Sequence, residues 1–370
     1  MNEKFLIHHS ISSIDKKNWD KYLSSNDPFL KTSYLEHFEQ LSKEEVKPFY
    51  IALNNGIIYG HLITIKGKKI ANYLERNSKI SVKKWMLKRV NFKFFCFGNT
   101  HLSNISTCSF KENQLDGTYV EELMLHIKKK YKVKFFLLPD HFLKCIEIKK
   151  KELSNRFKFI EIDPDMTLEI PKEWNSFQDY NNAIQSKYKK RLRKVYKDSK
   201  SISTKEIPEN NLFEKLNEMD LLYKNVYSKS AFSGPPFNME IFKSFIANKE
   251  VNFSTYGYYT ANNKLVAFSS EFFINNTLYS YFIGLDYKFN EEFSIYNRIL
   301  YDTITNGINK KVHKIIFGRT AAEFKSTIGA VPSPSISAVY IANDFLSWLF
   351  NPFIQKLSPA KWIQRRPFKS

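Results

Sequence analysis

Residues 264–330, KLVAFSSEFFINNTLYSYFIGLDYKFNEEFSIYNRILYDTITNGINKKVHKIIFGRTAAEFKSTIGA, decide the expected fold. The segments 265–274 and 278–286 are rich in aromatic and β-branched residues and flank the turn Asn275-Asn276-Thr277, which predicts a β-hairpin. A polar loop, a helix at about 295–309 and a strand at 314–317 come next. The stretch ends in a polar, glycine-bounded segment, where strand ends and helix N-termini offer backbone donors. It therefore predicts a β–loop–helix–β unit that holds a ligand.

The same order of elements occurs earlier in the chain. A hairpin around Asn54-Asn55-Gly56 opens the first unit, and a corresponding hairpin around Asn262-Asn263 precedes the second. The first unit continues with a strand at 92–98, a helix at about 119–130 and a strand at 133–138. We therefore expect an α/β protein with mixed sheets, built from two tandem copies of one unit. Chance likeness between two α/β stretches is the alternative, because few residues correspond.

We expect four consecutive parts, since a chain of 370 residues is long enough for two hydrophobic cores. They are an N-terminal domain (1–160), a linking strand and basic helix (161–200), a C-terminal domain that would carry the catalytic site (201–345), and a basic amphipathic tail (346–370).

The positive charge is concentrated in short segments. The formal net charge is +20, yet residues 201–345 contain fourteen Lys/Arg and fourteen Asp/Glu. Residues 187–200 contain eight basic residues and one acid, and residues 346–370 contain five basic residues and no acid. A concentration of this kind favours an acidic partner or surface.

A basic amphipathic helix is expected within residues 176–199. Its apolar positions recur every three or four residues on one face, at Ile184, Tyr188, Leu192 and Val195. A merely solvated face is the alternative, although such faces normally mix signs and Asp198 is the only acid among residues 187–200. The candidates for binding the donor or an anionic partner are Lys187, Lys189, Lys190, Arg191, Arg193 and Lys194.

The tail 346–370 combines bulky apolar residues with flanking cations, which suits a membrane interface. A helix packed on its own domain is the alternative. The N-terminus lacks the apolar core of a secretory signal, and no stretch approaches the ~20 apolar residues of a membrane span. Three cysteines without metal-binding spacing fit a reducing compartment. We expect a cytoplasmic protein, peripheral at the inner face of the cytoplasmic membrane.

An ordered set of motifs resembles the GNAT acyltransferase superfamily. It comprises Lys187-Tyr188-Lys189-Lys190-Arg191 after a Pro-Asp-Met-Thr-Leu strand, then Gly284-Leu285-Asp286, Asn306-Gly307, Phe317-Gly318-Arg319 and Phe324-Lys325. The likeness is to the FemAB-like, double-domain branch and extends to the acetyltransferase-like domain beside cellulose-synthesis genes and to GNAT-type lipid N-acyltransferases. It implies two tandem GNAT-like domains. It also implies an acyl thioester in the splay between the two central strands of the second copy, where an amine attacks it.

The sequence departs from the simplest members of that superfamily just before the helix at 295. Their glycine-rich pyrophosphate loop is absent, and residues 287–294 carry no glycine and two acids. This absence argues against backbone binding of a CoA pyrophosphate. The co-substrate would then be acyl-CoA held otherwise, an acyl carrier protein, or a charged tRNA as in the FemAB branch. No bound cofactor is expected.

Acyl transfer to an amine needs a base for the attacking ammonium and donors for the thioester oxyanion. On the strand 265–274, Glu271 shares a face with Ala267 and Ser269, which would leave room for a ligand. The opposite face is nearly all apolar. We therefore expect Glu271 to be the general base, directly or through water. A surface or ion-paired glutamate is the alternative.

Arg319, Glu323 and Lys325 follow a strand end, where sheets of this kind bind ligands. Arg319 and Glu323 would be neighbours on a helix, either as a structural ion pair or with Arg319 holding an anionic group of the acceptor. Lys325 would serve the same anion or the donor. The substrate-binding candidates are Ser269, Tyr281, Asp286, which would grip the ammonium, and His101 from the corresponding loop of the first copy. The sequence contains no metal-binding motif.

These observations predict an N-acyltransferase that moves an acyl group from a thioester donor to an amine acceptor, such as a long-chain amine or lipid precursor. Aminoacyl transfer from tRNA to a cell-wall precursor is the first alternative, since the basic helix suits phosphates equally well. A non-catalytic protein that binds anionic membrane or nucleic acid is the second.

Overall fold

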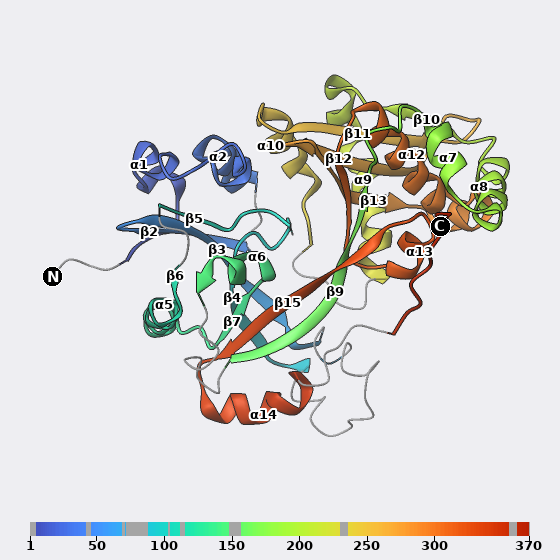
Figure 1. The fold of residues 1–370 in the computed structure, drawn as a ribbon. Coiled ribbons are helices and arrows are strands. Elements are labelled where there is room, and N and C mark those ends of the chain that lie inside the picture. Colours follow the sequence, from blue (N-terminus) through green and yellow to red (C-terminus); the bar gives the residue numbers. More distant parts are fainter. Residues whose placement is uncertain are drawn as a thin grey trace. The chain divides into compact units, whose positions relative to one another are not determined.

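The computed structural model describes residues 5–41, 46–68, 71, 88–102, 104–111, 115–147, 157–229, 236–354 and 361–369. The chain forms two compact units, and each is built from three separate stretches of sequence (Figure 1). Unit 1 comprises Met1–Ile162, Ala231–Ser244 and Ser335–Pro359, and unit 2 comprises Asp163–Ser230, Phe245–Pro334 and Ala360–Ser370. The expected consecutive domains differ from these units, because the basic helix belongs to unit 2 and residues 335–359 return to unit 1.

The strands of unit 1 lie in the order β1 (Leu6–His8), β2 (Val46–Leu53), β3 (Gly56–Lys66), β4 (Asn91–Phe97), β7 (Phe135–Leu138) and β15 (Val331–Ile341). The start of β15, up to Pro334, is part of unit 2. β2 and β3 form the predicted hairpin, and β4 and β7 are parallel neighbours. The short strand β5 (Cys108–Phe110) pairs with β3, while β6 (Leu115–Asp116) and β8 (Ile146–Glu147) pair with each other.

The helices of unit 1 are η1 (Ile11–Ser13), α1 (Lys16–Asp20), η2 (Pro28–Leu30), α2 (Thr32–Leu41), α5 (Gly117–Tyr131), α6 (Asp140–Lys144), η3 (Met239–Ile241) and α14 (Asp344–Ile354). Among them, α5, α6 and α14 bury apolar side chains together with residues of this sheet. In α5, the apolar residues recur every three or four positions, and Leu123 and Ile127 are buried against Phe95 and Phe136. The helix starts where the Asp116 side chain accepts a hydrogen bond from the Thr118 N–H.

The strands of unit 2 lie in the order β9 (Phe157–Glu169), β14 (Lys314–Gly318), β13 (Thr277–Leu285), β12 (Leu265–Ile274), β11 (Asn252–Tyr259) and β10 (Ser203–Glu206). The start of β9, up to Ile162, is part of unit 1. β11, β12 and β13 are antiparallel, and β13 and β14 are parallel. This repeats the order of β2, β3, β4 and β7, with α5 and α12 (Ile295–Asn309) as the corresponding crossover helices. The predicted repetition of one α/β unit is therefore confirmed.

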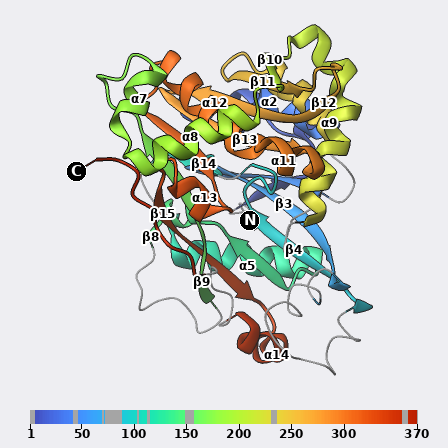
Figure 2. The same cartoon turned by 90° about the vertical axis from the view of Figure 1, so that its right-hand side faces the viewer.

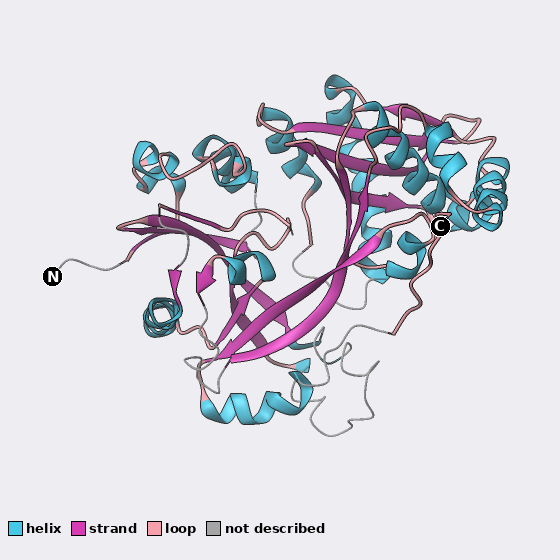
Figure 3. Ribbon diagram, in the orientation of Figure 1, coloured by secondary structure: helices cyan, strands magenta, loops and turns pink. Residues whose placement is uncertain are grey.

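Helices cover both faces of the unit 2 sheet (Figure 3). On one face, α9 (Glu209–Lys229) places Leu222 against Phe268 and Gly284. On the other lie α12 and the helices α7 (Phe177–Ala183), α8 (Ser186–Asp198), α11 (Tyr287–Phe293) and α13 (Ala322–Ser326). The remaining helix, α10 (Phe242–Ala247), contains residues of both units.

Two expectations about helices are wrong. The single helix expected at 176–199 is two helices, because Ile184 is extended between α7 and α8 and forms a bridge with Phe368. Its predicted apolar face is nevertheless buried, at Ile184, Tyr188, Leu192 and Val195. The polar loop expected at 287–294 is mostly α11, whose first turn is capped by Asp286 accepting from the Lys288 N–H.

The expected single tail at 346–370 is also wrong. Helix α14 belongs to unit 1, where Phe350 and Ile354 are buried with Phe135. Residues 361–369 instead run along unit 2, and Phe368 packs in its core next to Gly329. No helix in the described ranges is long and apolar enough to cross a membrane.

Candidate functional site

The central strands of unit 2 diverge after a short contact. β13 and β14 pair only from Thr277–Tyr279 to Lys314–Ile316, and β13 then continues to Leu285 without a further β14 partner among the described residues. The β12–β13 register also shifts between Ser269 and Glu271. The Ser270 hydroxyl satisfies the backbone at this bulge, because it accepts from the Phe282 N–H at 3.0 Å and donates to the Phe282 carbonyl at 3.1 Å. The sheet therefore opens between β13 and β14, where the resemblance places the thioester.

The loop that follows β14 has an unusual backbone. Gly318, Thr320 and Ala321 have φ angles of 71°, 67° and 49°. A positive φ is costly for a β-branched residue such as threonine, and strain of this kind gathers at ligand-binding sites. A Cβ on Gly318 would meet no atom within 4 Å, so the space beside this residue is open. The strained loop thus borders free space at the carboxyl end of β14.

Lys325 holds this loop in place. Its ammonium donates to the carbonyl oxygens of Phe317, Gly318 and Arg319 at 2.7, 3.1 and 2.7 Å, and the residue is 4% exposed. Burial lowers the pKa of Lys325 to about 7, although the nearby carboxylates of Asp165 and Asp163 oppose the shift. The expectation that Lys325 binds a ligand anion is wrong, because its three donors face the backbone. Its role here is to shape the loop.

The expected Arg319–Glu323 pair is wrong. Helix α13 begins at Ala322, so Arg319 precedes the helix and its Nε instead lies 3.7 Å from Asp165 Oδ1. Glu323 accepts from Arg365, whose Nε is 3.1 Å from Glu323 Oε1. Asp165 was not a candidate from sequence, because its strand read as a connection between the copies. The sequence feature that could have indicated Asp165 is the pair of acids at 163 and 165 in this strand. In the structure, the adjoining Met166 pairs with Gly318, the residue before Arg319.

Glu271 lies beneath α12. Its two carboxylate oxygens each accept from Asn306 Nδ2 at 3.1 Å, and the residue is 1% exposed. Burial raises the pKa of Glu271 to about 7, while the hydrogen bonds from Asn306 oppose the shift. The expected room for a ligand on this face is wrong, because α12 covers it. A pKa near neutrality suits a general base, but the carboxylate is closed off from solvent.

The four substrate-binding candidates occupy separate places. Ser269 is buried on β12 beside Tyr258, and the Tyr281 ring packs on Phe272 at 5.2 Å between centroids. Asp286 caps α11 and lies 3.9 Å from Lys264 Nζ.

His101 belongs to unit 1, where its ring contacts Phe38, His61 and Phe237. Burial lowers the pKa of His101 to about 4, so its imidazole is neutral at pH 7.

Side chains of the protein itself form hydrogen bonds with the N-terminal end of α12. Asn290 Oδ1 accepts from the Tyr296 N–H at 2.7 Å, and the Ser294 hydroxyl donates to Asp198 at 3.3 Å. Asp198 also pairs with Lys194 at 2.9 Å, and the Arg191 guanidinium lies 5.5 Å from the Phe324 ring centroid. Basic side chains of α8 therefore lie next to the α12 N-terminus, in the position where the glycine-rich loop is missing.

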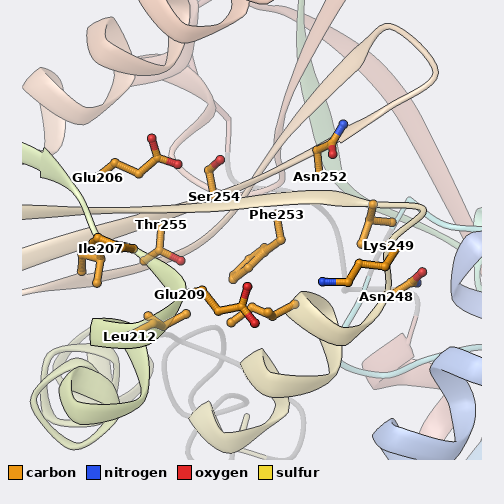
Figure 4. A pocket seen from close by; sticks show the side chains of 13 residues that line it. Glu206, Ile207, Glu209, Leu212, Asn248, Lys249, Asn252, Phe253, Ser254 and Thr255 are labelled. Carbon is orange, nitrogen blue, oxygen red and sulfur yellow. The ribbon is translucent and has the colours of Figure 1, made fainter.

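A pocket of about 310 Å³ lies at the other edge of the unit 2 sheet (Figure 4). β10 pairs with β11 only from Tyr256 onward, so the earlier residues of β11 border the pocket together with Glu206, Glu209 and Lys249. The Thr255 hydroxyl is buried in its wall and has no hydrogen-bond partner among the described residues. None of the sequence-derived candidates lines this pocket. Within the described ranges, no group of three or more His, Cys, Asp or Glu residues could hold a metal ion.

Comparison with known proteins identifies the fold. The sequence matches no protein-family model and no curated protein. A conserved protein of unknown function from Bacteroides thetaiotaomicron VPI-5482 is similar in structure, with a TM-score of 0.50, 12% identity, and coverage of 89% of this chain and 98% of that chain. FemX has a TM-score of 0.50 and 11% identity, with coverage of 93% and 99%.

Saccharomyces cerevisiae N-myristoyltransferase with bound myristoyl-CoA has a TM-score of 0.50 and 9% identity, with coverage of 92% of this chain and 79% of that chain. At these identities the likeness concerns the fold. Because it covers nearly the whole chain, this protein shares the fold of FemX and of that N-myristoyltransferase, and both of its units repeat one α/β order. The tandem fold expected from the resemblance to the GNAT superfamily and its FemAB-like branch is therefore confirmed.

Proposed function

We propose that the protein is a GNAT-type N-acyltransferase whose reaction takes place in unit 2, where β13 and β14 diverge. The observation that carries this proposal is their pairing over three residues each, followed by an opening that the strained loop after Gly318 borders. The fold shared with a myristoyl-CoA-bound transferase supports an acyl thioester, on CoA or on a carrier protein, as co-substrate. The acceptor is an amine, and a long-chain amine or lipid precursor is the class we propose.

The proposed reaction forms an amide and releases a thiol. The amine nitrogen attacks the thioester carbonyl, the C–S bond breaks, and the thiolate leaves and takes up a proton. Backbone N–H groups of β13 beyond its β14 contact supply donors for the oxyanion. Arg319, whose side chain is 24% exposed, binds an anionic group of the acceptor, and Asp165 orients it.

In the proposed reaction, the role of Glu271 is structural and not catalytic. A carboxylate sealed under α12 does not meet the acceptor ammonium, so the amine loses its proton to solvent water at the opening. The rate should then rise with pH towards the pKa of the acceptor amine. A plateau above pH 7 would instead mark Glu271 as the base, since its pKa is raised to about 7.

The test is thiol release from acyl-CoA of increasing chain length in the presence of amino acids, amino sugars and long-chain amines. Product mass identifies the amide. Turnover that needs both thioester and amine supports the proposal. If no thioester is consumed by a folded protein, on CoA or on a carrier protein, the proposal is wrong.

Aminoacyl transfer from tRNA is a second candidate because of α8. Lys187, Lys190 and Arg193 are exposed, and no acid pairs with them among the described residues. Cations along a helix can follow a phosphate backbone. Transfer of a labelled amino acid from charged tRNA to an amine, without turnover of acyl-CoA, would favour this candidate.

A further inference from the structure

Three neighbouring segments of unit 2 carry exposed apolar side chains. Phe324, Val331 and Ile363 are 48%, 50% and 60% exposed, although they come from α13, the start of β15 and the C-terminal segment 361–369. Gln364 Nε2 donates to the Ala330 carbonyl at 3.1 Å, and the Arg365 N–H donates to the Ser326 hydroxyl at 3.0 Å. These bonds tie the segment to both elements. The three apolar residues therefore extend from one continuous piece of structure.

Cations surround this apolar group. Arg191 of α8 lies over the Phe324 ring, and the exposed residues Lys361 and Arg366 flank Ile363 in the C-terminal segment. The segment is also joined to the start of α8, because Gln185 Nε2 donates to the Phe368 carbonyl at 2.9 Å. Figure 2 shows α8, α13 and this segment on the same side of unit 2. We call Phe324, Val331, Ile363 and the cations of α8 and 361–369 the basic–apolar surface.

Apart from Lys194 and Arg365, the cations of this surface form no ion pair with the described residues of unit 2. On α8, Asp198 is the only acid and pairs with Lys194, while Glu323 pairs with Arg365. Tyr188, Leu192 and Val195 supply the buried face of the helix, so its exposed lysines add nothing to the core. Their mutual repulsion is a cost to the folded protein that an anionic partner would relieve.

The exposed aliphatic residues decide which anionic partner fits. Nucleic acid offers phosphates to lysine and arginine, and single strands also stack their bases on aromatic rings, but the exposed aliphatic side chains of Val331 and Ile363 have no partner in either kind of contact. A membrane interface accepts aliphatic and aromatic side chains among the acyl chains and pairs lysine and arginine with anionic headgroups. We propose that the basic–apolar surface docks unit 2 onto anionic phospholipid, with Phe324, Val331 and Ile363 inserted at the interface.

The test is co-sedimentation of the full chain with phosphatidylcholine vesicles that contain or lack 30% phosphatidylglycerol. Binding should need the anionic lipid and fall when the salt is raised from 0.1 to 0.5 M. Lys187→Glu with Lys190→Glu should weaken binding at least 25-fold, since each lost cation contributes roughly fivefold. Val331→Ser with Ile363→Ser should weaken it about tenfold and leave the salt dependence unchanged.

Two matched control variants test whether vesicle binding depends on this surface in particular. Lys205→Glu with Lys249→Glu makes the same change in net charge at exposed positions of unit 2 away from α8, and it should lower binding less than threefold. Phe345→Ser with Trp348→Ser removes exposed apolar residues of α14 in unit 1 and should leave binding unchanged.

Equal losses in either control would overturn the assignment of this surface. So would a lack of vesicle binding, or tighter binding to a single-stranded RNA that displaces the vesicles. Thiol release from soluble acyl-CoA is measured without vesicles, so the two proposals are tested separately. The docking proposal can be wrong while the transferase proposal holds, and the transferase proposal can be wrong while the docking proposal holds.

Discussion

Asn306 Nδ2 lies 3.1 Å from both carboxylate oxygens of Glu271, so a side chain of α12 seals an acid on the neighbouring strand. An amide that donates to a carboxylate offsets part of the cost of burying it. The remaining cost appears as the raised pKa of Glu271, and it makes stability depend on pH.

Glu271→Gln should remove that dependence. In the folded protein the pKa of Glu271 is raised from 4.5 to about 7, so the folded state binds more protons between these values and wild-type stability falls as pH rises through them. The loss amounts to roughly 3 kcal/mol above pH 7. The glutamine variant should therefore have a higher Tm than wild type at pH 8 and a similar Tm at pH 4.5, measured by calorimetry.

The same variant separates the two roles of Glu271. With a structural role, Glu271→Gln keeps kcat within about threefold of wild type and keeps the rise of rate with pH. A loss of kcat beyond about 100-fold in a variant of unchanged fold would restore Glu271 as the base.

Arg319→Ala should lower kcat/KM for acceptors that carry an anionic group by about 100-fold, equivalent to ~2.7 kcal/mol, because the charge that binds this group is lost. Neutral amines should be affected less than fivefold. Glu323→Ala is the matched control, because Glu323 pairs with Arg365 at a site where both side chains are more than a third exposed. That surface pair should contribute about 1 kcal/mol or less to stability and little to activity. Equal losses for anionic and neutral acceptors would contradict the role of Arg319.

Lys325→Met should damage the loop after β14. Three carbonyl groups lose their shared donor, at a cost of about 1–3 kcal/mol, while relief of the buried ammonium offsets part of it. We expect a Tm lower by several degrees and a larger relative loss of kcat/KM, since the loop borders the opening. Lys264→Met, at a side chain 61% exposed, controls for the loss of one charge. Wild-type activity in Lys325→Met would show that the loop keeps its shape without the ammonium.

Two glycines provide a matched pair of alanine substitutions. Gly318 has a φ of 71° with no atom within 4 Å of an added Cβ, so Gly318→Ala should cost only the ~1–2 kcal/mol of a left-handed residue. Gly329 has a φ of 96°, and its added Cβ would overlap the Phe368 ring. Gly329→Ala should therefore cost more and loosen the C-terminal segment, which limited proteolysis can detect as earlier cleavage within 361–369. Equal stability of the two variants would contradict this packing.

Local patterns in the sequence were sufficient for most of the second unit. The aromatic and β-branched residues of 265–274 and the apolar period in 295–309 identify β12 and α12, because both signals depend on residues close in sequence. The Asn-Asn pair at 275–276 also has positive φ at both residues, as a hairpin turn of this type requires.

The site depended on contacts that no local pattern contains. Asp165 reaches Arg319 across 154 positions of sequence, and Lys325 turns back onto the end of its own preceding strand. The face of Glu271 read as open because its small neighbours suggested space, whereas α12 covers it. The spacing of residues along a strand shows on which face of the sheet a side chain lies, but it does not show which helix packs on that face.

The two units are each assembled from three stretches of chain, and this bears on how the protein is made. Residues 335–359 supply the last strand and helix of unit 1, yet the ribosome adds them only after nearly all of unit 2. A nascent chain that ends near residue 162 would expose the Phe135 and Phe136 faces that α14 and β15 later cover. Unit 1 therefore cannot be completed while unit 2 is still being synthesised, and until then its apolar strand faces are exposed to aggregation.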